Sequence, residues 1–180
     1  MRRLARTVAA VVLPCLVATL GAQAPEPRYP TQWDAALLRR PDLKAALAEL
    51  ERAFPRQVEE WIAIAEMPGK SRHEERRAAH VRRAMEAEGL AVTTDSMGNV
   101  TGVRKGTGGG PTIVFAAHVD IVHPLETDLK VSRQGDTLRG PGIFDNSASV
   151  ANMLAAIRAM NAAKVRTKGD LVFVATVQEE

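Results

Sequence analysis

The stretch Thr112-Ile113-Val114-Phe115-Ala116-Ala117-His118-Val119-Asp120 decides the fold that this sequence predicts. Residues 113–117 are apolar, which indicates a strand buried on both faces, as in a parallel sheet. In open α/β sheets, ligands bind beyond the carboxyl ends of the strands, where His118 and Asp120 fall. Both side chains lie on one side of the backbone, so the carboxylate can fix the imidazole tautomer for metal binding. An isolated His-x-Asp would more often be a core pair, and other acidic residues decide between these interpretations.

A second apolar strand is predicted over residues 170–177, directly before Glu179 and Glu180. The segment between the two strands predicts a helix over residues 148–162 with a broad apolar face. The order strand, helix, strand implies a right-handed parallel crossover. Glu179 and Glu180 are therefore expected at the same sheet edge as His118.

Asp145, just before this helix, is a further candidate site residue. It would lie at the positive end of the helix dipole, where a carboxylate is stabilised in its charged form, and Asn146 or Ser147 can cap the helix. One sheet edge then collects an imidazole and four carboxylates, from His118, Asp120, Asp145, Glu179 and Glu180. Carboxylates this close would repel one another without a cation. A divalent metal resolves the conflict, and oxygen ligands with one imidazole suit Zn, Co or Mn.

The rest of the chain predicts an α/β fold with a mixed, largely parallel sheet flanked by helices. Helices are expected over residues 43–53, 56–66 and 71–88, and strands over 90–94, 99–104, 129–132 and 137–139. Pro55 should break the first helical region, which Pro41 starts. Ser71 and Glu74 form a capping box for the helix after it. His73 and His80 on that helix are too far apart to chelate one ion, and we expect both to be solvated.

The N-terminus predicts export. Residues 1–24 have a basic start with three arginines, an apolar run over 8–20 that is too short to span a membrane comfortably, and small residues suited to cleavage after Ala22 or Ala24. Residues 25–41 are expected to be a linker, and residues 42–180 one domain. The protein would then be periplasmic or secreted, with no membrane partner once the signal is cleaved.

Charge and cysteine content restrict the partners of the exported chain. The whole sequence has 24 basic and 21 acidic residues, and loss of three signal arginines leaves 21 of each. Such a balance gives no argument for a nucleic-acid partner. Cys15 is the only cysteine and lies in the signal, so metal ligands must be His and carboxylates.

Four motifs, in order, resemble one family. They are Asp95-Ser96-Met97-Gly98-Asn99-Val100, Ala117-His118-Val119-Asp120, Gly140-Pro141-Gly142-Ile143-Phe144-Asp145-Asn146 and Thr176-Val177-Gln178-Glu179-Glu180. They resemble the zinc-dependent exopeptidases of metallopeptidase family twenty, which includes peptidase T, carboxypeptidase G and aminoacylases. Aminopeptidases of metallopeptidase family twenty-eight share much of the pattern, and the stretch around Gly140 favours the first family.

The resemblance implies a mechanism and a substrate class. His118 would ligate one zinc ion, Asp145 would bridge two, and Glu180 would ligate the second. Glu179 would be the general base, and Asp120 would orient His118. The Asp145–Asn146 peptide would be cis. The substrate would be a peptide or an N-acyl amino acid, and a full-length form could be a homodimer.

This sequence also departs from the family pattern. Three positions have residues that are unusual for the family, namely Ile121, Phe144 and Ser149. These departures affect the expected substrate more than the expected metal ligands. The chain is expected to be the N-terminal portion of a catalytic domain, with two protein ligands for each ion. A non-catalytic remnant is therefore the competing hypothesis. A serine hydrolase using Ser147 or Ser149 is a distant third, because neither lies in a Gly-x-Ser-x-Gly turn.

Overall fold

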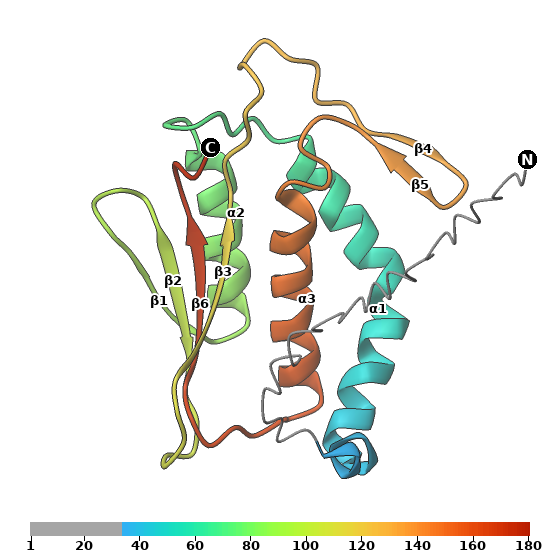
Figure 1. Ribbon diagram of the computed structural model, residues 1–180, viewed down its shortest axis with the longest axis vertical. Helices are drawn as coiled ribbons and strands as arrows, with labels where there is room; N and C mark the ends of the chain where they lie inside the picture. The colour runs from blue at the N-terminus through green and yellow to red at the C-terminus, as the bar shows by residue number, and fades with distance from the viewer. Residues whose placement is uncertain (1–33) are drawn as a thin grey trace, which may run out of the picture. The chain divides into compact units, whose positions relative to one another are not determined.

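The structure, a computed structural model, describes residues 34–180, and the predicted signal and the start of the predicted linker lie outside these residues. Its helices are η1 (Ala35–Arg39, a 3-10 helix), α1 (Pro41–Ala65), α2 (Glu75–Ala87) and α3 (Ser147–Ala162). Its strands are β1 (Ala91–Thr94), β2 (Val100–Arg104), β3 (Ile113–His118), β4 (Ser132–Gln134), β5 (Thr137–Arg139) and β6 (Leu171–Thr176). Figure 1 shows α1 and α3 side by side, with β3 and β6 beyond α3.

Four strands form the main sheet, in the order β1-β2-β6-β3. β3 and β6 are parallel, whereas the pairs β1-β2 and β2-β6 are antiparallel. The register places His118 opposite Thr176, so the two strands end level with each other. The predicted α/β class, the mixed sheet and the crossover through a helix are therefore confirmed. The expectation that the sheet is largely parallel is wrong, because only the β3-β6 pair is parallel among the described strands.

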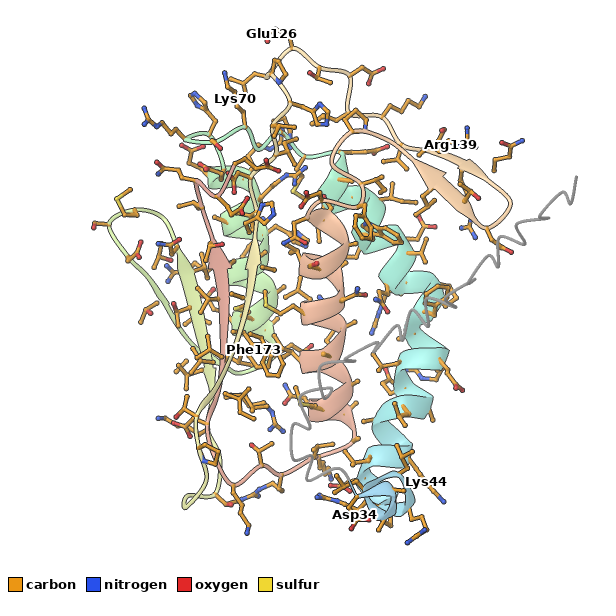
Figure 2. The ribbon with its side chains drawn as sticks, in the orientation of Figure 1. Asp34, Lys44, Lys70, Glu126, Arg139 and Phe173 are labelled. Atoms are coloured by element: carbon orange, nitrogen blue, oxygen red, sulfur yellow. The ribbon has the colours of Figure 1, made fainter. Side chains whose placement is uncertain are left out.

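The hydrophobic core lies on one face of this sheet. Along β6, Leu171, Phe173 and Ala175 are buried and alternate with half-buried residues. These side chains form one cluster with buried residues of α2 and α3, and Figure 2 shows Phe173 between β6 and α3. A smaller cluster around Ala46 and Ala159 packs α1 against α3. This packing fixes the N-terminus of α3 beside the carboxyl ends of β3 and β6 (Figure 1).

The prediction that the first apolar strand is buried on both faces is wrong. Ile113, Val114 and Phe115 of β3 are 48%, 60% and 47% exposed. Among the described strands, only β6 pairs with β3, which leaves β3 at the edge of the sheet. Phe115 stacks on Phe173 with ring centroids 5.4 Å apart, and both line a groove between β3 and α3. An apolar run favours burial, but it does not encode how many strands lie beside it.

The predicted break at Pro55 is also wrong, because α1 continues through this residue from Pro41 to Ala65. Pro55 is exposed, so its ring faces solvent. The hydrogen bond that its missing N–H would have made is therefore lost at the surface of the helix and not in the core. Buried Ala46 and Val58, before and after the proline, hold both halves of the helix in place. Figure 1 shows that the axis of α1 bends midway, as is typical of a helix with an internal proline.

The predicted capping box does not form. α2 begins at Glu75, and Glu74 makes no side-chain capping bond. The Ser71 hydroxyl donates instead to Asp120, 2.7 Å away, and the Glu74 carboxylate accepts the N–H of Gln178 at 3.0 Å. Both residues of the predicted box therefore bind the segments that carry the site.

The four short strands predicted over residues 90–104 and 129–139 form two hairpins, one from β1 and β2 and the other from β4 and β5. The strand predicted over residues 129–132 lies further along the chain, because β4 covers Ser132–Gln134, so only Gly135 and Asp136 separate it from β5. Gly135 has φ of 59°, a conformation that glycine adopts without strain.

The two histidines expected on the helix over residues 71–88 differ in environment, and only His80 lies on α2. His73 is exposed, as predicted. The prediction for His80 is wrong, since its Nε2 lies 3.2 Å from Oε1 of Glu60 on α1 and its side chain is 24% exposed. No helix within residues 34–180 has the length and apolar character needed to cross a membrane.

Candidate metal centre

His118, the last residue of β3, points its Nε2 atom at a group of carboxylates. Nε2 lies 3.0 Å from Oδ1 of Asp145 and 3.8 Å from Oε2 of Glu179. Ligand atoms of His118, Asp145 and Glu180 all lie within 4.8 Å of one another. The structure thus brings together the three side chains that the sequence predicts as metal ligands.

Asp145 reaches this position from the loop before α3. It precedes Asn146, the N-cap of α3, so its carboxylate lies at the positive end of the helix dipole, as predicted. The Asp145–Asn146 peptide is cis, which confirms the expectation from the family resemblance. Asn146 makes no side-chain capping bond, and the buried Ser147 hydroxyl donates to Gly142 O at 2.7 Å instead. The helix therefore starts without the predicted side-chain cap.

Glu179 and Glu180 lie in the turn that follows β6. Gln178 has φ of 59°, and its N–H donates to the buried Glu74 carboxylate. The N–H of Glu180 donates to Oδ2 of Asp120 at 2.9 Å. These two bonds hold the turn against α2 and the end of β3, and thereby place both glutamates at the predicted edge.

Asp120 lies behind His118 and is fully buried. Its Oδ2 accepts the Ser71 hydroxyl and the Glu180 N–H, while its Oδ1 lies 3.4 Å from His118 Nδ1. Burial alone would raise the pKa of Asp120, but the hydrogen bonds from Ser71 and from the backbone of Glu180 and Glu179 outweigh it and lower the pKa. The carboxylate is thus charged beside Nδ1, which favours a proton on Nδ1 and a lone pair on Nε2.

These residues fit a divalent cation. His118 Nδ1 and Asp120 Oδ1 are buried and lack a hydrogen-bond partner, and a small closing movement would join them. Among the ion pairs of the described residues, none joins Asp145, Glu179 or Glu180 to a lysine or arginine. The negative charge around Nε2 is therefore left for a cation to balance. One imidazole and two carboxylates suit Zn, Co or Mn.

Two residues that support the site were not predicted from the sequence. The sequence predicted a capping box for Ser71 and gave Arg77 no role. Arg77 is in fact buried, 1% exposed. The spacing of the sequence indicates the burial of Arg77, because this residue precedes the buried Val81 and Met85 by four and eight positions on one helix face.

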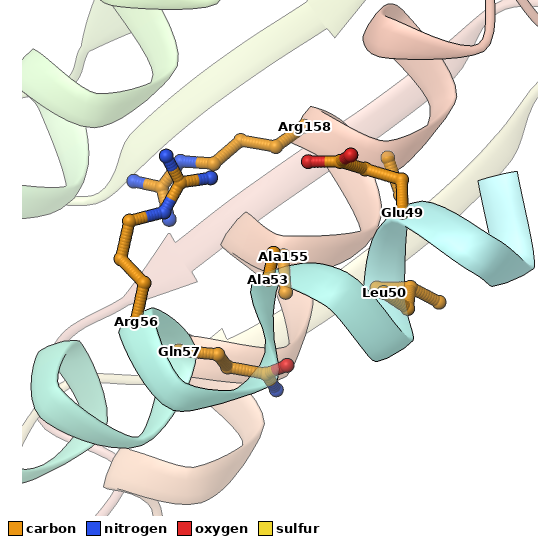
Figure 3. Close-up of a pocket in the computed structure, with 8 residues that line it drawn as sticks. Glu49, Leu50, Ala53, Arg56, Gln57, Ala155 and Arg158 are labelled. Atoms are coloured by element: carbon orange, nitrogen blue, oxygen red, sulfur yellow. The ribbon is translucent and has the colours of Figure 1, made fainter.

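A small hollow between α1 and α3 lies away from the metal centre. Figure 3 shows its lining, which includes Leu50, Ala53, Ala155 and the side chain of Arg158. It encloses about 10 Å³, which is room for at most one water molecule. This hollow is a packing defect between helices and does not contribute to the site.

Comparison with known proteins places the site in a family context. Residues 114–180 match the profile of Peptidase family M20/M25/M40. A protein of Pyrococcus abyssi named as a LysW-lysine/LysW-ornithine hydrolase is 32% identical over 123 residues, which cover 68% of this chain and 32% of that protein. Succinyl-diaminopimelate desuccinylase of Leptothrix cholodnii is 38% identical over 88 residues, covering 46% of this chain and 23% of the enzyme. The chain thus spans a third or less of the curated relatives that it matches.

Solved structures share the fold. Aminopeptidase PepT from Bacillus cereus superposes with a TM-score of 0.61 at 24% identity, covering 68% of this chain and 36% of the enzyme. Human carnosine dipeptidase 1 gives a TM-score of 0.66 at 15% identity, covering 74% of this chain and 34% of that one. Aminoacylhistidine dipeptidase from Vibrio alginolyticus gives 0.54 at 26% identity, covering 69% and 28%.

Proposed function

Because the chain belongs to peptidase family M20/M25/M40, we propose that it provides part of the active site of a metal-dependent hydrolase that cleaves an amide bond of a peptide or an N-acyl amino acid. One observation carries this proposal: His118, Asp145 and Glu180 converge within 4.8 Å at the carboxyl ends of β3 and β6. The names of the relatives, which include a desuccinylase and dipeptidases, support the substrate class.

The proposed metal is zinc, with His118 and Asp145 holding one ion and Asp145 and Glu180 a second. Bound there, zinc would supply a Lewis acid that polarises a scissile carbonyl and would lower the pKa of a water molecule to about 7. Asp120 keeps the imidazole in the tautomer that presents Nε2, because its charged Oδ1 faces Nδ1 at 3.4 Å.

Glu179 is the proposed general base. Its side chain is 60% exposed, and its Oε2 lies 3.8 Å from His118 Nε2, beside the three ligands. It accepts a proton from water as the water oxygen bonds to the carbonyl carbon. It then gives this proton to the amide nitrogen as the C–N bond breaks, so that the amine leaves neutral.

The proposed location is the periplasm or the exterior of the cell, and it rests on the basic and apolar pattern of residues 1–24. A small peptide or acylated amino acid is proposed as the partner in preference to a nucleic acid, because the exported chain has balanced charge. The proposal that a longer form is a homodimer rests on the family resemblance alone.

Zinc titration by calorimetry tests the proposed site. We expect His118→Ala to abolish the zinc binding of the unmodified chain, because it removes the only imidazole ligand. Glu179→Gln should keep zinc binding, because Glu179 is proposed as a base and not as a ligand. Zinc binding that survives His118→Ala unchanged would refute the site.

A non-catalytic remnant of such a hydrolase is the second candidate. The observation that favours it is the ligand count, since the converging group in residues 34–180 has three members for two proposed ions. Sequencing the gene beyond the codon for Glu180 separates the two candidates. Further acidic and histidine ligands in frame support the enzyme, and a stop codon supports the remnant.

A further inference from the structure

Arg77 of α2 is a charged side chain that the proposed mechanism does not use. It is 1% exposed, and burial lowers its pKa to about 10, with the charge of Asp120 opposing that shift. The guanidinium therefore remains protonated at neutral pH. A buried charge is costly unless its N–H groups are all placed on acceptors.

The acceptors of Arg77 come from three separate segments beside the metal centre. Nη2 donates to Ala65 O at 3.1 Å, at the end of α1, and Nε donates to Met67 O at 2.9 Å, two residues further on. Nη1 donates to Val119 O and to the Ser147 hydroxyl oxygen, each at 3.3 Å. Val119 lies between His118 and Asp120, and Ser147 is two residues after Asp145. One rigid group thus binds both loops that deliver proposed ligands.

Gly69 supports the same arrangement independently. A Cβ atom at this position would lie 2.5 Å from Cδ and 2.6 Å from Nε of Arg77, so only glycine lets the backbone pass this close. Gly69 O in turn accepts the N–H of Ile121 at 2.9 Å. The segment after α1 therefore packs between Arg77 and the loop that carries His118 and Asp120.

We propose that Arg77 is a positioning residue of the metal centre, which fixes the separation of the His118 loop and the Asp145 turn by hydrogen-bonding to both. This inference rests on the proposed function. The planar guanidinium has five N–H groups in a fixed fork, so it can hold three segments in one geometry. A lysine ammonium has a single nitrogen and cannot reach all of them.

The test compares Arg77→Met and Arg77→Lys with Arg82→Met as a matched control. Arg82 lies on the same helix and makes hydrogen bonds to Glu86 and Thr94 at the surface. With Co²⁺ as a spectroscopic probe, we expect Arg77→Met to weaken binding by about 10- to 100-fold, as for other residues that orient metal ligands. Arg77→Lys should recover little of this loss, and Arg82→Met should bind like the unmodified chain. Full recovery by Lys would refute the positioning role, because it would mean that charge alone matters.

Hydrogen exchange in metal-free protein tests the role without the metal. We expect faster exchange in peptides covering residues 117–122 and 142–150 for both Arg77 variants, and no change for Arg82→Met. If Arg77→Met does not fold, Gly69→Ala serves instead, because it displaces the Arg77 side chain without removing it. Unchanged exchange in Arg77→Lys and Gly69→Ala would overturn the inference. Failure of the unmodified chain to bind Co²⁺ would overturn the proposed function, while the exchange measurement would still decide the role of Arg77.

Discussion

At the scale of single residues, Glu60 joins three helices. Its carboxylate on α1 accepts two hydrogen bonds from the Arg158 guanidinium on α3, one of them at 2.9 Å, and lies 3.2 Å from His80 Nε2 on α2. Burial alone would raise the pKa of Glu60, but the bonds from Arg158 and His80 outweigh it and bring the pKa from 4.5 to about 2. The ionised carboxylate therefore stabilises the packing of the helices.

This pKa shift predicts a pH-dependent stability. Because the folded-state pKa lies below the unfolded value of 4.5, the contribution is complete above pH 4.5 and is lost as the pH falls toward 2. We expect Glu60→Gln to cost about 2 kcal/mol at pH 7, after allowance for partial exposure. Between pH 5 and pH 3, urea unfolding should show a shallower loss of stability for Glu60→Gln than for the unmodified chain. The exposed Glu59→Gln is the control, and equal pH slopes for all three proteins would contradict the prediction.

At this scale, only those residues of the candidate site whose side-chain type and position stand out in the sequence could be predicted. His118, Asp120, Asp145, Glu179 and Glu180 stand out because carboxylates and an imidazole follow apolar strands or precede a helix. Ser71 and Arg77 do not, because their partners are mostly backbone atoms of distant segments, which have no sequence signature. A local pattern predicted a helix cap for Ser71, which tertiary contacts overrode, and no local pattern singled out Arg77.

At the scale of elements, Pro55 is a position where tertiary packing outweighs local preference. α1 continues through Pro55, which lacks the N–H that would bond to the carbonyl of Glu51. We expect Pro55→Ala to raise the free energy of unfolding by about 1 kcal/mol, because it restores that bond and removes the clash of the ring with the preceding turn.

The same substitution at Pro41 provides the control. Pro41 is at the start of α1, where proline lowers the entropy of the unfolded chain and loses no hydrogen bond. Pro41→Ala should therefore destabilise the protein by about 0.5 kcal/mol, opposite in sign to Pro55→Ala. Urea unfolding measures both. A loss of stability in Pro55→Ala would mean that the bend in α1 is itself needed for packing on α3.

The edge position of β3 predicts unequal costs for two stacked phenylalanines. Phe173 is 2% exposed in the centre of the sheet, whereas Phe115 is 47% exposed on the edge strand. We expect Phe173→Ala to cost about 3–5 kcal/mol and Phe115→Ala about 1 kcal/mol in urea unfolding. Equal costs would contradict the open edge and would indicate that β3 is covered in solution, a result that sedimentation of the unmodified chain would check.

At the scale of the whole molecule, the topology assembles the site from distant parts of the sequence. The β3-α3-β6 crossover places strand ends and a helix N-terminus together, and this order could be predicted from periodicity alone. The burial of β3 could not, because it depends on how many strands the sheet contains. The crossover therefore predicts where ligands gather, while the number of ligands has to be counted in the structure.

That count leads to a prediction about activity. Zinc sites normally hold at least three protein ligands, whereas His118, Asp145 and Glu180 together offer three for two proposed ions. We expect the 180-residue chain alone to bind zinc weakly and to hydrolyse no dipeptide. A longer product of the same gene that adds ligands should be active and should lose activity in Glu179→Gln.

Calorimetry with zinc and a dipeptide hydrolysis assay measure these outcomes on the 180-residue chain. His118→Ala is the control for any residual metal binding. Tight binding of two ions with metal-dependent turnover would show that three side chains suffice, with solvent or backbone atoms completing each coordination shell. Weak binding without turnover would instead mean that the correct placement of these side chains does not by itself make the site catalytic. Glu179 can act as a base only on a water molecule whose pKa is lowered by a firmly held ion.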